Sequence, residues 1–210
     1  MRNINFEYLI LNPSTKAQLL ALQNSKPHAL LFYGPDGVGK LTVALAWSAN
    51  LTDEEFISVI ESDDGAAIGI ETIRELYKNT RSRLRSHQIV IIDHAELMST
   101  EAQNSLLKLL EEPRPNLTFV LLAPEVGDLL PTIISRLQPV KILPAESRQI
   151  AELIKQSRPN ITSAQLNQLL FIADGRIGIA MRFLHDDDFL NKQIELMQTA
   201  KKLITEGRYE

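Results

Sequence analysis

One short glycine-rich segment constrains the fold of this chain more than any other feature of its sequence. Gly34 is followed by four residues and then by Gly39 and Lys40, which is the spacing of a phosphate-binding loop. The apolar run 29–33 precedes this loop, and a helical pattern follows it over 40–50. In such a loop, backbone N–H groups and the positive end of the following helix face the phosphates. A strand–loop–helix unit that binds a nucleotide is therefore favoured over a generic turn.

The predicted cofactor-binding residues belong to this loop, to the start of the helix and to one acidic residue further along the chain. They are Gly34, Pro35, Asp36, Gly37, Val38, Gly39, Lys40, Leu41, Thr42 and Asp93. Leu41 stands where a Ser or Thr hydroxyl would bind magnesium. Thr42 lies about 100° further around the helix, so it does not simply replace that ligand. The sequence predicts a cradle that binds ATP or ADP weakly and lacks one Mg²⁺ ligand.

Apolar runs and helical patterns alternate over the first two thirds of the chain. Runs without polar alternation indicate strands buried on both faces, and they occupy 29–33, 56–60, 89–92, 119–122 and 140–142. The helical patterns occupy 40–50, 70–84 and 100–112. In the last of these, Thr100 and Gln103 have the spacing of a capping box, and Pro113 ends the pattern. This alternation predicts an α/β domain with a parallel sheet.

The strand pattern stops near Pro144. Three helical patterns follow over 147–157, 162–173 and 178–184, and a further one runs from about 189 to 206. We therefore expect an α/β domain over 1–144 and a three-helix domain over 145–188. The segment 189–210 is expected to be the first helix of a further domain that is otherwise missing from the chain.

Composition excludes several functional classes. The 210 residues include no cysteine and only four scattered histidines, which excludes thiolate chemistry and argues against a zinc site. The net charge of −4 argues against bulk attraction to nucleic acid or to an anionic membrane. No apolar run approaches the roughly 20 residues of a membrane-spanning helix. The first residues lack the layout of a signal peptide, so we expect a soluble cytoplasmic protein without a membrane partner.

Asp93 ends the apolar run 89–92, where a phosphate-loop ATPase needs an acidic residue. It is a candidate to hold magnesium directly or through water, and the alternative is a carboxylate that only caps the strand end. In enzymes that hydrolyse ATP the next residue is usually a Glu that activates water, whereas His94 stands here. Histidine can accept a proton, but we interpret His94 as a lost base. Nothing in the sequence places Glu96 in the site.

Several segments, taken in order, resemble the clamp-loader subunits of bacterial DNA polymerase III, which are AAA+ ATPases. They are HALLFYGPDGVGK, IGIETIRELYKNT, IVIIDHAELMSTEAQNSLLKLLEEPRPNLTFVLLA and LLPTIISR, and the resemblance extends over roughly residues 15–185. It implies an AAA+ P-loop NTPase fold with a five-stranded parallel sheet, a small three-helix lid and a collar domain. It also implies gamma/tau and delta subunits as partners and, through the complex, the sliding clamp and primed DNA.

The family contains an ATP-hydrolysing motor subunit, gamma/tau, and a delta-prime subunit that is often nucleotide-inactive. The motor's magnesium hydroxyl is replaced by Leu41, its catalytic Glu by His94 and its phosphate-sensing Thr by Pro124. The segment 175–178 has glycine where the motor has a lid arginine, and the family's four-cysteine zinc module is missing. These differences favour the delta-prime type, without independent ATPase activity.

One functional residue of the family is kept. Ser135 and Arg136 match its Ser-Arg-Cys motif, with Leu137 in place of the Cys. The resemblance implies that Arg136 is a catalytic finger that acts in trans on a neighbour's ATP. From the residues alone, an arginine that binds helix carbonyls or forms a surface ion pair is the alternative. Two other functions stay open: an ATP-hydrolysing gamma/tau-type motor, with Thr42 or water as the missing ligand, and an AAA+ adaptor outside replication.

Three further groups of residues are predicted to be structural or solvated. The basic residues Arg74, Lys78, Arg81, Arg83 and Arg85, with His87, could face DNA, but alternate arginines do not share one helix face, so a solvated face is favoured. Asp186, Asp187 and Asp188 are interpreted as solvated loop carboxylates. Trp47 and the leucines of LLKLLEE are predicted to be core residues.

Overall fold

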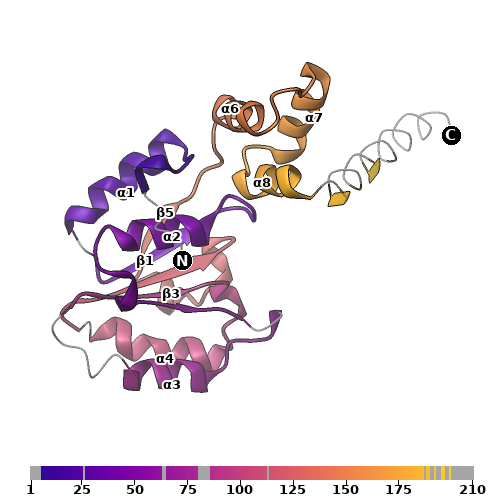
Figure 1. The fold of residues 1–210 in the computed structure, drawn as a ribbon. Helices are drawn as coiled ribbons and strands as arrows, with labels where there is room; N and C mark the ends of the chain where they lie inside the picture. Colours follow the sequence, from indigo (N-terminus) through magenta and orange to yellow (C-terminus); the bar gives the residue numbers. More distant parts are fainter. Residues whose placement is uncertain are drawn as a thin grey trace. The chain divides into compact units, whose positions relative to one another are not determined.

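The computed structural model describes residues 6–25, 27–62, 65–79, 86–112 and 114–186, together with 188, 189, 192, 195, 196 and 199. For residues 77–79 it describes the backbone alone. The chain divides into two compact units, Met1–Leu143 and Pro144–Glu210, which are described separately (Figure 1).

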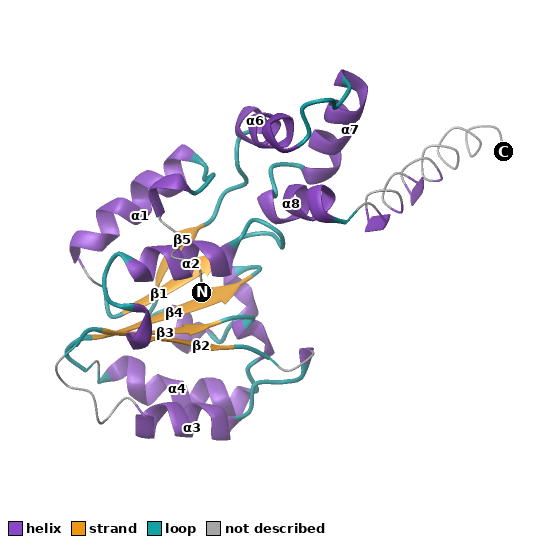
Figure 2. Ribbon diagram, in the orientation of Figure 1, coloured by secondary structure: helices purple, strands orange, loops and turns teal. Residues whose placement is uncertain are grey.

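The first unit contains a five-stranded parallel sheet with the strand order β2-β3-β4-β1-β5 (Figure 2). The strands are β1 (Ala29–Tyr33), β2 (Ile57–Ile60), β3 (Gln88–Ile92), β4 (Leu117–Ala123) and β5 (Gln138–Lys141). All residues of β3 and β4 are buried, as expected for parallel strands covered on both faces. The predicted parallel α/β sheet is confirmed.

Helices cover both faces of this sheet. One face carries α1 (Pro13–Ser25) and α2 (Lys40–Ala49), and the other carries α3 (Ile70–Asn79), α4 (Thr100–Glu111) and α5 (Pro131–Ile134). The two core clusters alternate along each strand, because successive strand side chains point to opposite faces. In β1, for example, Leu30 and Phe32 belong to the cluster of α1 and α2, and Leu31 belongs to the other.

Trp47 is a core residue, as predicted. Its side chain is fully buried and lies edge-on to Phe32, with ring centroids 6.1 Å apart. The indole N–H donates to the Leu19 carbonyl oxygen at 3.1 Å, so its one polar atom is satisfied. The tryptophan therefore joins α1, α2 and β1.

Two helix starts differ from the prediction. Ser99, not Thr100, caps α4, because its hydroxyl accepts the Ala102 N–H at 3.1 Å. The expected capping box of Thr100 and Gln103 is thus wrong. Helix α1 is not predicted, although Asn12 and Pro13 carry a start signal: the Asn12 side chain accepts the Ser14 N–H at 3.0 Å.

Element ends also differ by a few residues. Strand β5 begins at Gln138 and includes Pro139, which an edge strand tolerates because β5 pairs only with β1. Phe56 ends the short 3₁₀ helix η2 (Glu54–Phe56), so β2 starts one residue later than predicted. Of the predicted helix 70–84, the part 80–84 lies outside the described residues, as does Pro113.

Over residues 144–186, the second unit contains helices at the three predicted places: α6 (Ser147–Ser157), α7 (Ser163–Ala173) and α8 (Ile177–His185). Thr162 and Gln165 form a capping box at the start of α7. The side chains of Ile154, Leu169 and Phe183 are buried among the helices. The further helix predicted over about 189–206 falls mostly outside the described residues.

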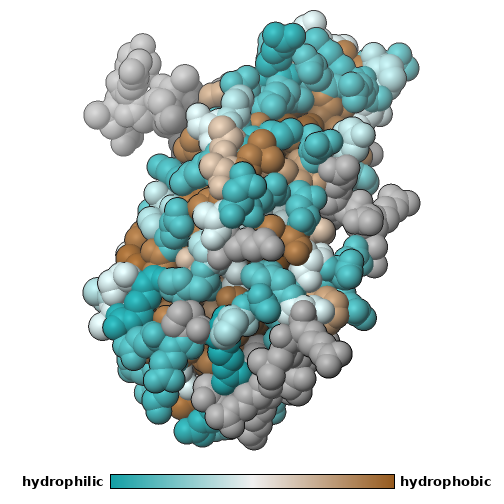
Figure 3. All heavy atoms as spheres, turned by 90° about the vertical axis from the view of Figure 1, so that its left-hand side faces the viewer, coloured by the Kyte–Doolittle hydropathy of each residue, from teal (hydrophilic) through white to brown (hydrophobic). Residues whose placement is uncertain are grey.

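The surface is mixed in character. On the face drawn in Figure 3, hydrophobic residues are interspersed among hydrophilic ones. Over the part of the chain that the structure describes, the exposed large hydrophobic side chains are Tyr8, Leu20, Phe171, Met181 and Leu196. None of the described helices has the length and hydropathy needed to cross a membrane.

Candidate functional site

The predicted cofactor-binding residues lie at the carboxyl edge of the sheet. Because the strands are parallel, the segments that follow β1, β3 and β4 meet at that edge. The Gly34 N–H, which opens the loop after β1, is shared between the carbonyl oxygens of Ala123 at 3.3 Å and Pro124 at 3.1 Å. Asp93 follows β3, and its N–H donates to the Ile60 carbonyl at 2.9 Å. The loop, Asp93 and Pro124 therefore share one edge.

The loop has the backbone shape of a phosphate cradle. Gly37 and Gly39 have φ angles of 85° and 88°, in the left-handed region that favours glycine. Gly39 precedes α2, and no side chain caps this helix within the described structure. The first N–H groups of α2 can therefore serve an anion. Val38 anchors the loop because its side chain is buried in the core with α1 and α2.

Lys40 is buried at the start of α2 and is held by the loop itself. Its Nζ donates to the Gly34 carbonyl oxygen at 2.8 Å and to Asp36 Oδ1 at 3.0 Å. The Lys40 side chain is 9% exposed, whereas that of Asp36 is 75% exposed. The ammonium group therefore lies inside the loop, where a phosphate would meet it, with a carboxylate already bound.

The residue after Lys40 supplies no hydroxyl ligand for a magnesium ion. Leu41 is half-buried and packs against the core cluster of α1 and α2. Thr42 is exposed. A leucine side chain offers no oxygen to a cation, so this position supplies no metal ligand.

Asp93 and His94 form a tight turn after β3. His94 has a φ angle of 49°, which is uncommon for a residue with a side chain. The Asp93 carboxylate accepts the His94 N–H at 2.9 Å, so Asp93 satisfies its own turn as in the structural alternative. The His94 Nδ1 lies 3.0 Å from Glu96 Oε1. The structure thus brings Glu96 to His94, which sequence reasoning did not predict.

The electrostatic surroundings raise the pKa of His94 above its ordinary value. The largest cause is the hydrogen bond with Glu96; burial opposes it, and the negative charges of Asp93, Glu96 and Asp36 add to it. Asp36 belongs to the loop after β1 and His94 to the turn after β3. The charge of the loop therefore reaches the turn. Glu96 Oε2 is buried and has no hydrogen-bond partner within the described structure.

Pro124 and Gly178 stand where the resemblance implies a phosphate-sensing Thr and a lid Arg, and neither supplies a phosphate ligand. Pro124 has no side-chain donor. The guanidinium of Arg176 is held by the end of α7, where it donates to the carbonyl oxygens of Ala173 at 3.1 Å and Ile172 at 3.2 Å. Gly178, in α8, has no side chain to offer.

Arg136 follows α5 and is about one third exposed. Its Nη2 lies 2.7 Å from Glu111 Oε1, and its Nη1 donates to the Thr132 carbonyl at 2.8 Å and to Ser135 Oγ at 3.1 Å. Both contacts of the structural alternative, a helix carbonyl and an ion pair, are therefore present. Sequence reasoning missed Glu111, which lies 25 residues away along the chain.

Arg136 lies at the amino edge of the sheet, opposite the loop. It stands two residues before the start of β5 at Gln138, and Leu30 near the start of β1 is in register with Gln138. The loop follows the other end of β1, and five strand residues span roughly 16 Å. Arg136 therefore does not join the loop of its own chain.

Gln103 connects the helices that carry this ion pair. It is buried near the start of α4, donates to the Met98 carbonyl at 3.3 Å and accepts the Leu130 N–H at 2.8 Å. Leu130 immediately precedes α5. The amide thereby fixes the entry of α5 relative to α4. A polar residue inside an otherwise apolar helix face was the available signal for such a role.

The other predicted residues are only partly described. Arg74 is exposed and pairs with Glu71, as expected for a solvated face. His87 Nε2 lies 3.1 Å from Thr118 Oγ1. Asp186 accepts the Phe189 N–H at 2.8 Å, which is a helix-start contact. The residues that lie outside the description are Arg81, Arg83, Arg85 and Asp187, together with the side chain of Lys78.

Comparisons with known proteins agree on one group of replication proteins. A family model described as DNA polymerase III, delta subunit, matches residues 50–146. DNA polymerase III subunit delta' of Pseudomonas aeruginosa is 27% identical over 84% of the chain and 61% of its own length. The Bacillus subtilis delta' subunit is 30% identical over 81% and 58%, and replication factor C small subunit 1 of Pyrobaculum aerophilum is 28% identical over 85% and 56%. The chain thus spans about three fifths of these relatives.

Solved structures show the same fold at low sequence identity. A gamma subunit-related protein of DNA polymerase III from Thermotoga maritima superposes with a TM-score of 0.64 and 23% identity, over 92% of this chain and 67% of that one. The RuvB branch migration motor from the same organism gives 0.67 and 19%, over 96% and 67%. The chain therefore has the AAA+ fold of these structures, and its sequence is similar to those of delta' subunits and of replication factor C subunits.

Proposed function

We propose that the chain serves DNA replication as a delta-prime-like clamp-loader subunit, mostly structural, whose Arg136 acts on the ATP of a neighbouring subunit. The observation that carries this proposal is the separation of two features. The loop at the carboxyl edge has the shape of a nucleotide site, but Leu41 offers no magnesium ligand and His94 stands where a catalytic carboxylate is expected. Arg136, at the amino edge, lies too far away to serve that loop. An arginine so placed is suited to a site on another chain.

The loop supports weak binding of ATP or ADP without independent hydrolysis. Leu41 offers no magnesium ligand, and His94 replaces the carboxylate that would activate water. Lys40 and the N–H groups of α2 remain as phosphate ligands. Such a site can hold a phosphate group but lacks the groups that stabilise the transferring one.

Arg136 is suited to a phosphate in trans. Arginine presents a rigid fork of N–H donors that matches carboxylate and phosphate oxygens. In the isolated chain this fork binds the exposed carboxylate of Glu111. The phosphate of a neighbour's ATP would take the place of Glu111, since both offer anionic oxygens. The expected partners are gamma/tau and delta subunits and, through the assembled complex, the sliding clamp and primed DNA in the cytoplasm.

The test is DNA-stimulated ATP hydrolysis by a complex reconstituted with motor subunits. We expect Arg136→Ala to lower the rate by about 10³- to 10⁵-fold for the site it serves, the range measured for such fingers. Arg148→Ala is the matched control, because Arg148 is an exposed arginine paired with Glu152 on α6. If an assembled Arg136→Ala complex hydrolysed ATP at an unchanged rate, that result would contradict the proposal.

A motor function is the second candidate, and one observation favours it. Glu96 holds His94 through Nδ1, as a carboxylate holds the histidine of a general-base pair. If this pair activates water, the isolated chain should turn over ATP steadily. That turnover should be abolished by both Lys40→Ala and His94→Gln. Turnover that survives either substitution would come from a contaminating ATPase.

A further inference from the structure

The ammonium group of Lys40 is bound by an anion of its own loop. Asp36 Oδ1 lies 3.0 Å from Lys40 Nζ, and the Gly34 carbonyl oxygen is the second acceptor at 2.8 Å. The lysine is buried and the aspartate is largely exposed. In a phosphate-binding loop, the lysine is the side chain that reaches the outer phosphates. In this chain the Asp36 carboxylate contacts the lysine.

The charges around the loop are unfavourable to a polyphosphate. Three carboxylates, those of Asp36, Asp93 and Glu96, act on the same His94 ring. Asp36 Oδ1 lies 3.0 Å from Lys40 Nζ, and Asp93 and Glu96 contact His94 at the same edge of the sheet. Pyrophosphate or ADP adds further negative charges to this edge, and Leu41 supplies no ligand for a neutralising cation. Like charges at short range disfavour each other.

We propose that Asp36 sets the affinity and selectivity of the loop: its carboxylate occupies Lys40 as a built-in anion and weakens the binding of polyphosphates. This inference rests on the proposed degenerate nucleotide site and deepens it. Asp36 belongs to the predicted cofactor-binding residues, but its role is the opposite of a ligand. The carboxylate competes with the phosphate for Lys40 and also repels it.

The expected size of the effect follows from the exposure of Asp36. A tethered competitor is always present at an effective concentration set by its short tether. Because the Asp36 carboxylate can turn into solvent, a ligand displaces it at the modest cost of a surface ion pair. Removing the charge should therefore tighten binding by about three- to fivefold, in line with a partly exposed pair.

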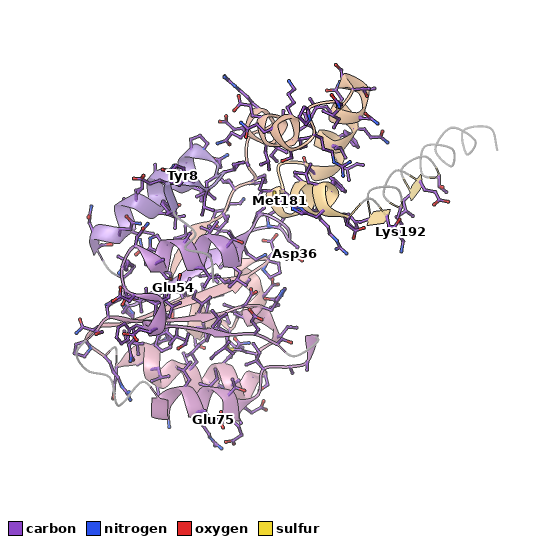
Figure 4. All side chains as sticks on the ribbon, viewed as in Figure 1. Tyr8, Asp36, Glu54, Glu75, Met181 and Lys192 are labelled. Atoms are coloured by element: carbon purple, nitrogen blue, oxygen red, sulfur yellow. The ribbon has the colours of Figure 1, made fainter. Side chains whose placement is uncertain are left out.

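The experiment is a calorimetric titration of the full chain with pyrophosphate, and separately with ADP, at low ionic strength and without magnesium. Asp36→Asn keeps the shape of the side chain and removes its charge. Glu75→Gln, an exposed acidic residue on α3, makes the same change in net charge far from the loop (Figure 4). We expect Asp36→Asn to bind about three- to fivefold tighter, with Glu75→Gln within about twofold of the natural chain. Lys40→Met should abolish binding in both the natural and the Asp36→Asn chain.

Salt provides a second readout, because the advantage of Asp36→Asn should shrink as ionic strength rises. Unchanged thermal unfolding of Asp36→Asn would show that the fold is kept. Equal or weaker binding by Asp36→Asn would overturn the inference, and so would the lack of any binding by either chain. The proposed trans action of Arg136 needs no nucleotide on this chain, so its own hydrolysis test would still decide it.

Discussion

The carboxyl edge of the sheet, which carries the loop, and the amino edge, which carries Arg136, differ in character. At the carboxyl edge the loop has the backbone of a phosphate cradle, with Gly37 and Gly39 in left-handed conformations. Leu41 and His94 stand there at the two positions on which the proposed loss of hydrolysis rests. At the amino edge Arg136 is kept within a set of side-chain contacts. The difference teaches that the backbone shape of a phosphate-binding loop and the ability to hydrolyse a nucleotide are separate properties. The fold itself can require the first.

Gly34 shows how the fold requires a loop glycine. A Cβ at this position would lie 2.5 Å from the Ile142 carbonyl oxygen, where β5 ends beside β1. Ile142 in turn donates its N–H to the Tyr33 carbonyl at 2.7 Å. The glycine thus allows two strands to stay paired. Its presence alone does not indicate nucleotide binding.

The largest expected effect is on folding stability, and it tests whether the fold requires a glycine at position 34. Gly34→Ala should lower the free energy of unfolding by about 3 kcal/mol, because backbone must move to admit the methyl group. Gly127→Ala is the control, since a Cβ there meets no atom within 4 Å and should change stability by less than about 0.5 kcal/mol. Urea unfolding measures both. Equal stability of the two variants would contradict a structural requirement at Gly34.

The second prediction concerns the magnesium ligand that Leu41 does not supply. Leu41→Thr should make ATP binding magnesium-dependent and should cost about 1 kcal/mol of stability, because the half-buried leucine loses apolar contacts. Leu45→Thr, one turn later in α2 and packed on the same core, should cost a similar amount without that dependence. Calorimetric titrations with and without magnesium measure it. Magnesium-dependent binding by the natural chain would refute the view that Leu41 disables the metal site.

The third prediction concerns the amino edge. Glu111→Gln should lower the free energy of unfolding by less than about 1 kcal/mol, because the pair with Arg136 is partly exposed. In the reconstituted complex, ATP hydrolysis should not fall, since Glu111 competes with phosphate for the arginine. Glu112→Gln, the exposed neighbour at the end of α4, serves as the control. A rate as low as that of Arg136→Ala would instead make Glu111 a positioning residue.

The smallest effect is a pH dependence at the carboxyl edge. Because the folded state raises the pKa of His94, its contribution to stability is present below about pH 6.5 and is lost as pH rises through the folded-state pKa. The side chain is half exposed, so this contribution should be below about 1 kcal/mol. Urea unfolding across this range should show a flatter profile for both His94→Gln and Glu96→Gln. An unchanged profile in both variants would rule out this linkage.

The sequence predicts those parts of the molecule that depend on local pattern. The apolar runs that become β1, β3 and β4 and the glycine spacing of the loop are readable without a partner element. The capping of α4 is also local, but two hydroxyls in succession, Ser99 and Thr100, compete for the same role. The start of β5 is obscured by Pro139, which is acceptable only because the strand lies at the sheet's edge.

Contacts between distant segments could not be read from the sequence. The pair of Arg136 with Glu111 and the contact of Gln103 with Leu130 join residues 25 and 27 positions apart. The Asp36 contact with Lys40 is local. The sequence does not show, however, whether the exposed carboxylate turns toward the lysine or into solvent. The sequence therefore placed Asp36 among the ligands, whereas its contact points to an opposing role.

The buried amide of Gln103 has a mechanical consequence. It holds the Leu130 N–H at the entrance of α5, and Arg136 stands just beyond the exit of that short helix. Turning α5 away from α4 would strand a buried acceptor without its donor, which carries a desolvation penalty. The Gln103 contact therefore favours one position of the start of α5, the helix that Arg136 follows. If Arg136 acts in trans as proposed, its distance from the neighbour's phosphate would change mainly through movement of the α/β unit as a whole.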